Sequence, residues 1–153
     1  MNLPNKITTF RMVCVVIIDF ILLFPWAQCG VKMPMVFDKI SLEYFISFFL
    51  FVIASFSDFL DGYIARKYNL VTTYGKFMDP IADKLLVDST IIICAIKLPN
   101  LVPAVVAVIM IARDLLVDAL RQLASAKGVV LAANMWGKIK TVTQMVALSF
   151  VLL

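Results

Sequence analysis

The stretch EYFISFFLFVIASFSDFLDGYIA, residues 43–65, decides what kind of fold this chain adopts. After Glu43 it holds no charged residue until Asp58 and is rich in phenylalanine, leucine and isoleucine. About 20 consecutive apolar residues form a helix that can cross the hydrocarbon core of a bilayer. The stretch therefore predicts a transmembrane helix whose last turns, from Asp58 to Arg66, are charged.

The whole chain has the same apolar character. Of its 153 residues, 63% are hydrophobic and 16% are charged, whereas a soluble domain is about half apolar and about a quarter charged. Besides residues 43–65, apolar runs occupy residues 7–27, 77–97, 103–124 and 136–153. We therefore expect an all-α fold, a polytopic transmembrane helical bundle with five spans, formed by residues 1–153 as a single domain.

The distribution of positive charge predicts which side of the membrane each connection faces. Cytoplasmic ends of spans carry an excess of Lys and Arg. If the N-terminus lies inside, eleven of these residues are at inner ends and three are in outer loops. The run after Lys6 and Arg11 resembles a signal peptide, but no small-residue cleavage site follows it. We expect a retained first span, with the N-terminus and the link between residues 65 and 77 facing the cytoplasm.

The residue types that are missing exclude several kinds of catalysis. The chain has no histidine, and its three cysteines lie far apart without a C-x-x-C pair. Serine–histidine triads, histidine-ligated zinc and an imidazole base are therefore excluded, and no redox motif is indicated. Carboxylates, lysines and arginines remain for chemistry, and we expect no nucleic-acid partner.

Four of the nine aspartates lie within 26 residues, at the ends of two successive apolar runs. At ~100° per residue, Asp58 and Asp61 share one face of the helix predicted for residues 43–65. Asp79 and Asp83, four residues apart, share one face of the next. A short link makes these helices antiparallel neighbours, so we expect the four carboxylates to converge just inside the cytoplasmic boundary.

Such a cluster of acids needs positive charge. An uncompensated Asp in the middle of a membrane helix costs ~2.5–3.5 kcal/mol, and like charges in one pocket repel each other. Salt bridges to Arg66, Lys76 and Lys84 are one explanation. Hard divalent ions are another, because carboxylate oxygens suit Mg²⁺ and Mn²⁺. Two such ions serve phosphoryl transfer by holding the attacking and leaving oxygens, and we expect two ions here.

Residues 58–83 also read D-x-x-D-G-x-x-A-R, eight residues, then G-x-x-x-D-x-x-x-D. This pattern resembles the signature of the CDP-alcohol phosphotransferases at all eight specified positions. The resemblance implies that Asp58, Asp61 and Asp79 ligate metal. It implies that Asp83 joins them at the metals and acts as the general base on the acceptor hydroxyl.

The resemblance also implies a binding site for CDP-diacylglycerol. Residues 4–11 read P-N-x-x-T-x-x-R, which is similar to the branch of the family that uses glycerol 3-phosphate as acceptor. Close helix packing through small residues is the alternative explanation for Gly62 and Ala65. The residues implied for the CDP-diacylglycerol site are Asn5, Thr8, Asp61, Gly62, Ala65, Arg66 and Gly75.

An acceptor such as glycerol 3-phosphate brings a phosphate, which needs cations of its own. Its candidate ligands are Arg113, Lys138, Lys140, Arg121 and Arg11. The alternative is topology, because Lys and Arg gather at the inner ends of spans in any membrane protein. We expect Asp114 to hold Arg113. For Asp19, Asp88 and Asp118 we expect interhelical polar contacts and assign no role in the site.

The resemblance thus implies an integral-membrane enzyme of phospholipid synthesis. It would transfer the phosphatidyl group of CDP-diacylglycerol to sn-glycerol 3-phosphate and release CMP. Membrane lipids are further partners, and the family implies a homodimer. Two alternatives are open: the same chemistry with inositol phosphate, serine or phosphatidylglycerol as acceptor, or divalent-cation transport. The family has six spans, and the short last run predicts that the sixth is missing here.

Overall fold

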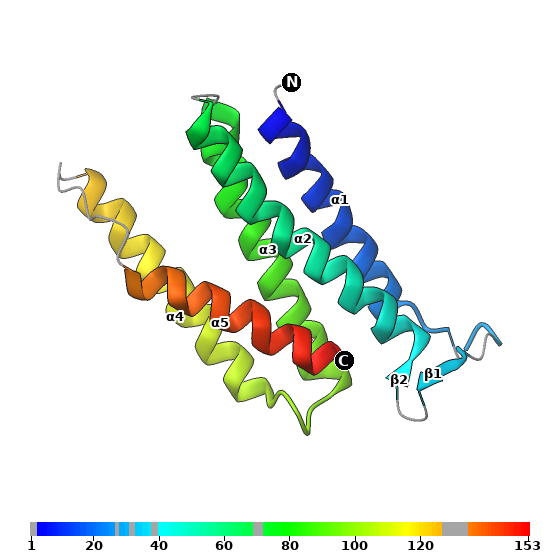
Figure 1. The fold of residues 1–153 in the computed structure, drawn as a ribbon. Helices are drawn as coiled ribbons and strands as arrows, with labels where there is room; N and C mark the ends of the chain where they lie inside the picture. Colours follow the sequence, from blue (N-terminus) through cyan, green and yellow to red (C-terminus); the bar gives the residue numbers. More distant parts are fainter. Residues whose placement is uncertain (1–2, 27, 31–32, 38–39, 69–71, 127–134) are drawn as a thin grey trace.

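The computed structural model describes residues 3–26, 28–30, 33–37, 40–68, 72–126 and 135–153. These residues form five α-helices and one small β-hairpin (Figure 1). The helices are α1 (Leu3–Leu23), α2 (Leu42–Lys67), α3 (Thr73–Lys97), α4 (Ala104–Ala126) and α5 (Met135–Leu152). The hairpin pairs β1 (Met35–Phe37) with β2 (Ile40–Ser41) in antiparallel fashion, in the connection before α2. The predicted helical fold is confirmed.

The core lies where α1 packs along both α2 and α3. Buried side chains include Ile18 and Leu22 of α1, Phe51 of α2, and Leu86 and Ile91 of α3. As expected, α2 and α3 run in opposite directions (Figure 1). They are in contact, as expected of neighbours, but each packs far more extensively on α1 than on the other.

Large apolar side chains also cover the outside of the bundle. Val16, Phe20, Phe56, Phe59 and Val108 are all more than half exposed. A soluble monomer rarely exposes large contiguous apolar patches. Among the helices that the structure describes, one segment, Leu42–Leu60, is long and apolar enough to cross a membrane by length and composition, and Ile139–Leu152 is a shorter apolar stretch.

The predicted spans α3 and α4 carry too many charged residues to meet that condition of length and apolar composition. In α3 the charged residues lie between Lys76 and Asp88, apart from Lys97 in the last turn. In α4 they occupy the second half, from Arg113 to Arg121. In each of these two helices a charged segment thus interrupts the apolar run. The charged ends of α1, α2 and α3 meet at one end of the bundle (Figure 1).

Candidate active site

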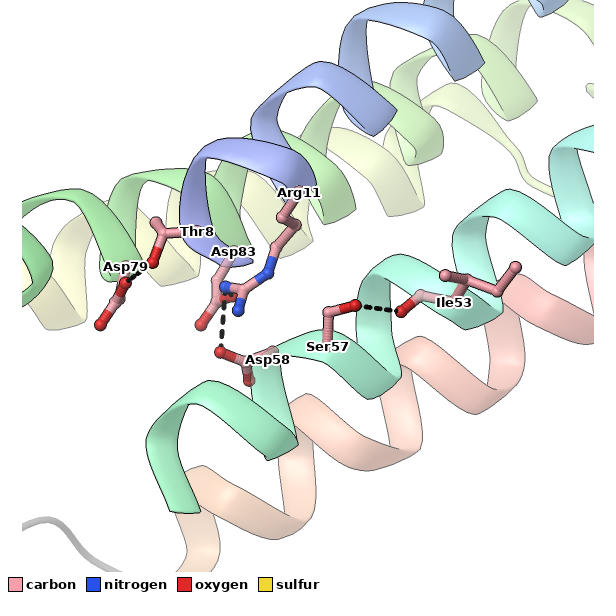
Figure 2. Close-up of polar contacts among 7 residues, drawn as sticks. All are labelled: Thr8, Arg11, Ile53, Ser57, Asp58, Asp79 and Asp83. Atoms are coloured by element: carbon pink, nitrogen blue, oxygen red, sulfur yellow. Dashed lines mark hydrogen bonds and ion pairs between the residues drawn. The ribbon is translucent and has the colours of Figure 1, made fainter. Parts of the chain in front are cut away.

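Arg11 lies at the centre of the polar end of α1, α2 and α3. Its side chain has no exposed surface. Its Nη1 atom lies 3.0 Å from Oδ1 of Asp58 on α2 and donates a hydrogen bond to Oδ1 of Asp83 on α3, as Figure 2 shows. A buried guanidinium is tolerated when carboxylates compensate its charge. Arg11 therefore links α2 to α3 through α1.

Thr8 connects the preceding turn of α1 to the third acid. Its buried hydroxyl donates a 2.6 Å hydrogen bond to Oδ1 of Asp79 (Figure 2). Thr8 precedes Arg11 by three residues and Asp79 precedes Asp83 by four, so each pair lies about one turn apart on its helix. Successive turns of α1 thus contact successive acids of α3.

A third contact joins the start of α1 to the start of α3. The hydroxyl of Thr72 donates a 2.7 Å hydrogen bond to Oδ1 of Asn5. The same hydroxyl oxygen accepts a 3.0 Å hydrogen bond from the backbone N–H of Gly75, so that Thr72 caps α3. A Cβ atom on Gly75 would lie 3.3 Å from both Asn5 Oδ1 and Thr72 Oγ1. Glycine therefore allows the close approach of α1 and α3 here.

The cap makes a first prediction. Replacing Thr72 with valine keeps the side-chain shape but removes the cap and the contact with Asn5. Loss of an N-cap costs about 1–2 kcal/mol, so we expect the melting temperature to fall by about 4 °C. Thermal unfolding in detergent, followed by circular dichroism, measures this. The matched control is Thr143→Val on an exposed face of α5, and an equal effect of both variants would contradict the role of the cap.

The aspartates of the site are of the right chemical type to bind a divalent ion. They offer oxygen ligands, which hard cations prefer, and Asp58 and Asp83 already converge on one positive charge from two helices. Asp61 follows Asp58 by one turn of α2, but its side chain lies outside the described residues. Among the side chains that are described, no three acids, cysteines or histidines gather closely enough to hold a metal. Asp79 is paired with Thr8 whereas Asp58 and Asp83 are paired with Arg11.

A second polar cluster joins α3, α4 and α5. Nη1 of Arg113 lies 2.9 Å from Oδ1 of Asp114, which confirms the expected pair. Lys140 of α5 donates a hydrogen bond to the other oxygen of Asp114. Lys84 of α3 forms an ion pair with Asp118 of α4, so Asp118 makes the interhelical contact expected of it.

The two remaining aspartates also face other helices. Asp88 on α3 lies close enough to Asp114 and Lys140 to interact with their charges. Asp19 on α1 is adjacent to Ser89 on α3. Neither lies among the contacts around Arg11. Asp88 therefore borders the second polar cluster, and Asp19 lies where α1 contacts α3.

The remaining predicted residues are distributed unevenly. Arg121 is exposed on α4, and Gly62 is half-buried on α2. Besides Asp61, the side chains of Ala65, Arg66 and Lys138 lie outside the described residues. At one end of the bundle the structure brings Asn5 close to Gly75, Thr8 to Asp79, and both Asp58 and Asp83 to Arg11.

Arg11 is the residue whose surroundings sequence reasoning missed. We expected it at the phosphate of the acceptor, but it contacts two of the expected metal ligands. The spacing of Asn5, Thr8 and Arg11, three residues apart, places all three within one side of α1. That shared side, next to the acids, is the pattern that indicates the contact.

Comparisons with known proteins point to one family. The family model described as CDP-alcohol phosphatidyltransferase matches residues 1–153. A protein from Bacillus subtilis named CDP-diacylglycerol–glycerol-3-phosphate 3-phosphatidyltransferase is 44% identical, covering 99% of this chain and 77% of its own length. Proteins with the same name from Rickettsia typhi and Haemophilus influenzae are 41% and 34% identical. They cover 99% and 96% of this chain and 76% and 73% of their own lengths.

Proposed function

Because this chain belongs to the CDP-alcohol phosphatidyltransferase family, we propose that it transfers the phosphatidyl group of CDP-diacylglycerol to sn-glycerol 3-phosphate. Relatives named for this reaction match almost the whole chain. The observation that carries the proposal is the convergence of Asp58 and Asp83, from two helices, on Arg11. It places acids of the family signature together at one end of the bundle.

The enzyme works as a multi-span protein of the bacterial cytoplasmic membrane. The exposed apolar side chains, the span Leu42–Leu60 and the lipid nature of CDP-diacylglycerol support this. The polar end of the bundle faces the cytoplasm by the positive-inside rule. The site therefore lies at the inner interface, where the lipid substrate and a water-soluble acceptor meet. A homodimer stays a prediction from the family resemblance.

Asp58, Asp61, Asp79 and Asp83 hold two divalent ions, Mg²⁺ or Mn²⁺. When bound, these ions would neutralise charge on the diphosphate and on the departing CMP. The protein's own residues fix the ligands in place: Thr8 orients Asp79, and Arg11 holds Asp58 beside Asp83. Asn5, Thr8, Asp61, Gly62, Ala65, Arg66 and Gly75 line the site for CDP-diacylglycerol.

In the reaction, the acceptor hydroxyl attacks the phosphorus that carries the diacylglycerol. The bond from that phosphorus to the bridging oxygen breaks, and CMP leaves. Asp83 takes the proton of the hydroxyl. Its exposed fraction of 29% makes it accessible to an acceptor that approaches from outside the bundle.

The phosphate of the acceptor binds at Arg113 and Lys140, the two cations that Asp114 holds. Arg113 is half exposed and is oriented by Asp114, which also holds Lys140. A guanidinium held in this way has donors left for phosphate oxygens. Lys138 and Arg121 are the other cations proposed for this phosphate, whereas Arg11 is buried against Asp58 and Asp83.

Arg113 supplies a second prediction. Replacing it with glutamine is expected to raise the KM for glycerol 3-phosphate about tenfold, because one charge-assisted contact is lost. The KM for CDP-diacylglycerol should stay within about twofold. Steady-state kinetics measure both constants. Lys97→Gln, on an exposed lysine at the other end of α3, is the control, and equal changes in both KM values would contradict the assignment.

Product analysis tests the choice of acceptor. Purified protein would receive labelled CDP-diacylglycerol with glycerol 3-phosphate, inositol phosphate, serine or phosphatidylglycerol, each alone and in competition. We expect phosphatidylglycerophosphate to form and the other lipids to be absent. Preferred transfer to another alcohol would keep the family chemistry and refute the proposed acceptor.

A further inference from the structure

A single nitrogen of Arg11 contacts two carboxylates. Nη1 lies 3.0 Å from Oδ1 of Asp58 and forms an ion pair with Oδ1 of Asp83. One centre of positive charge therefore sits between one oxygen from α2 and one oxygen from α3 (Figure 2). A cation that bridges two carboxylates occupies a position of this kind.

The three side chains differ in burial, so that one side of the site is open to solvent and the other side is closed. The side chain of Arg11 is 0% exposed, whereas those of Asp58 and Asp83 are 32% and 29% exposed. The two acids can be reached from outside the bundle, and the guanidinium lies behind them. An ion that arrives from the open side meets the carboxylates while Arg11 already contacts them from within.

Charge then determines what Arg11 does. Without it, two ionised carboxylates from different helices would face each other and repel. With it, the pair has a net charge of about −1 instead of −2. The same positive charge repels a divalent cation that binds these acids. Arg11 therefore stabilises the two neighbouring carboxylates when no ion is bound and lowers the affinity of these carboxylates for a divalent ion.

We propose that Arg11 is the resident counter-ion of this site: it holds Asp58 and Asp83 together when no metal is bound, and it lowers the affinity for the metal. The inference rests on the proposed metal site. Arg11 is a positioning residue, since it acts through the two acids. The diphosphate of the substrate would offset its charge, so the metal and the substrate bind more tightly together than either does alone.

The test compares the purified full chain in detergent with its Arg11→Met variant. The melting temperature is measured in chelator, and the affinity for Mn²⁺ is measured by electron paramagnetic resonance of the free ion. In chelator, the variant should melt about 5 °C lower because the two acids lose their partner. Its Kd for Mn²⁺ should be about tenfold lower, because the positive charge that repels the ion has been removed.

A purely structural role of Arg11 predicts the opposite change in affinity, because misplaced ligands bind an ion less tightly. An unchanged or higher Kd for Mn²⁺ would therefore overturn the inference, and so would an unchanged melting temperature in chelator. Arg11→Gln, which keeps an amide donor near the acids, is the second variant if Arg11→Met does not fold. It should shift the Kd in the same direction.

Two controls separate charge from position. Arg11→Lys keeps the charge and should bind Mn²⁺ within about threefold of the wild type. Lys97→Met removes the same charge from the far end of α3 and should change neither quantity. If the wild type binds no Mn²⁺, the proposed metal site is wrong and the inference falls with it. If the wild type binds Mn²⁺ and Arg11→Met binds it no more tightly, the metal site stands and the role of Arg11 is wrong.

Discussion

Replacing Asp58 with asparagine is expected to lower the rate of CMP release from CDP-diacylglycerol about a thousandfold. Asparagine has nearly the same shape but carries no charge, so the proposed metal site loses a ligand. The ion pair with Arg11 is lost as well. Release of labelled CMP from purified protein in detergent measures the rate, and circular dichroism shows whether the variant is folded.

Asp118→Asn is the matched control for this experiment. It makes the same chemical change in an ion pair with Lys84, outside the contacts around Arg11. We expect its rate to stay within about twofold of the wild type. A folded Asp58→Asn protein with near-normal activity would remove Asp58 from the reaction.

Removal of divalent metal is expected to have an equally large effect. Dialysis against a chelator should reduce CMP release to background, and Mg²⁺ or Mn²⁺ should restore it. The four aspartates of the signature offer only oxygen ligands, which are the ligands these small hard ions prefer. Ca²⁺ is larger and takes more ligands, so it should restore less activity.

The melting temperature gives an independent measure of the same binding. An ion that binds the folded state but not the unfolded state raises the free energy of unfolding as the ion concentration increases. We therefore expect Mg²⁺ to raise the melting temperature of the wild type and to have a smaller effect on Asp58→Asn. Full activity after exhaustive chelation would contradict the metal site.

The helices could be predicted from the sequence because an apolar run of about 20 residues seldom forms anything other than a helix. Residues 43–65 and 77–97 became α2 (Leu42–Lys67) and α3 (Thr73–Lys97). The largest difference for these two is at the start of α3, where the side chain of Thr72 caps the helix four residues earlier than the apolar run suggests. Hydrophobicity indicates where a helix is buried, but hydrogen-bonding side chains decide where it begins.

The composition of the site was only partly predictable. Spacing on a helix shows that Asp79 and Asp83 share a face, but it does not show which helix packs against that face. The structure places α1 there, so Thr8 and Arg11 become partners of the acids. The hydrogen bond between Thr72 and Asn5 could not be predicted from the sequence either, because it depends on how two distant segments lie in space.

CMP release from purified protein, with one component omitted at a time, tests the central claim most directly. We expect release to require CDP-diacylglycerol, glycerol 3-phosphate and Mg²⁺ together, with one phosphatidylglycerophosphate formed for each CMP. CMP release that continues at the same rate without glycerol 3-phosphate, or a complete reaction that yields neither product, would contradict it.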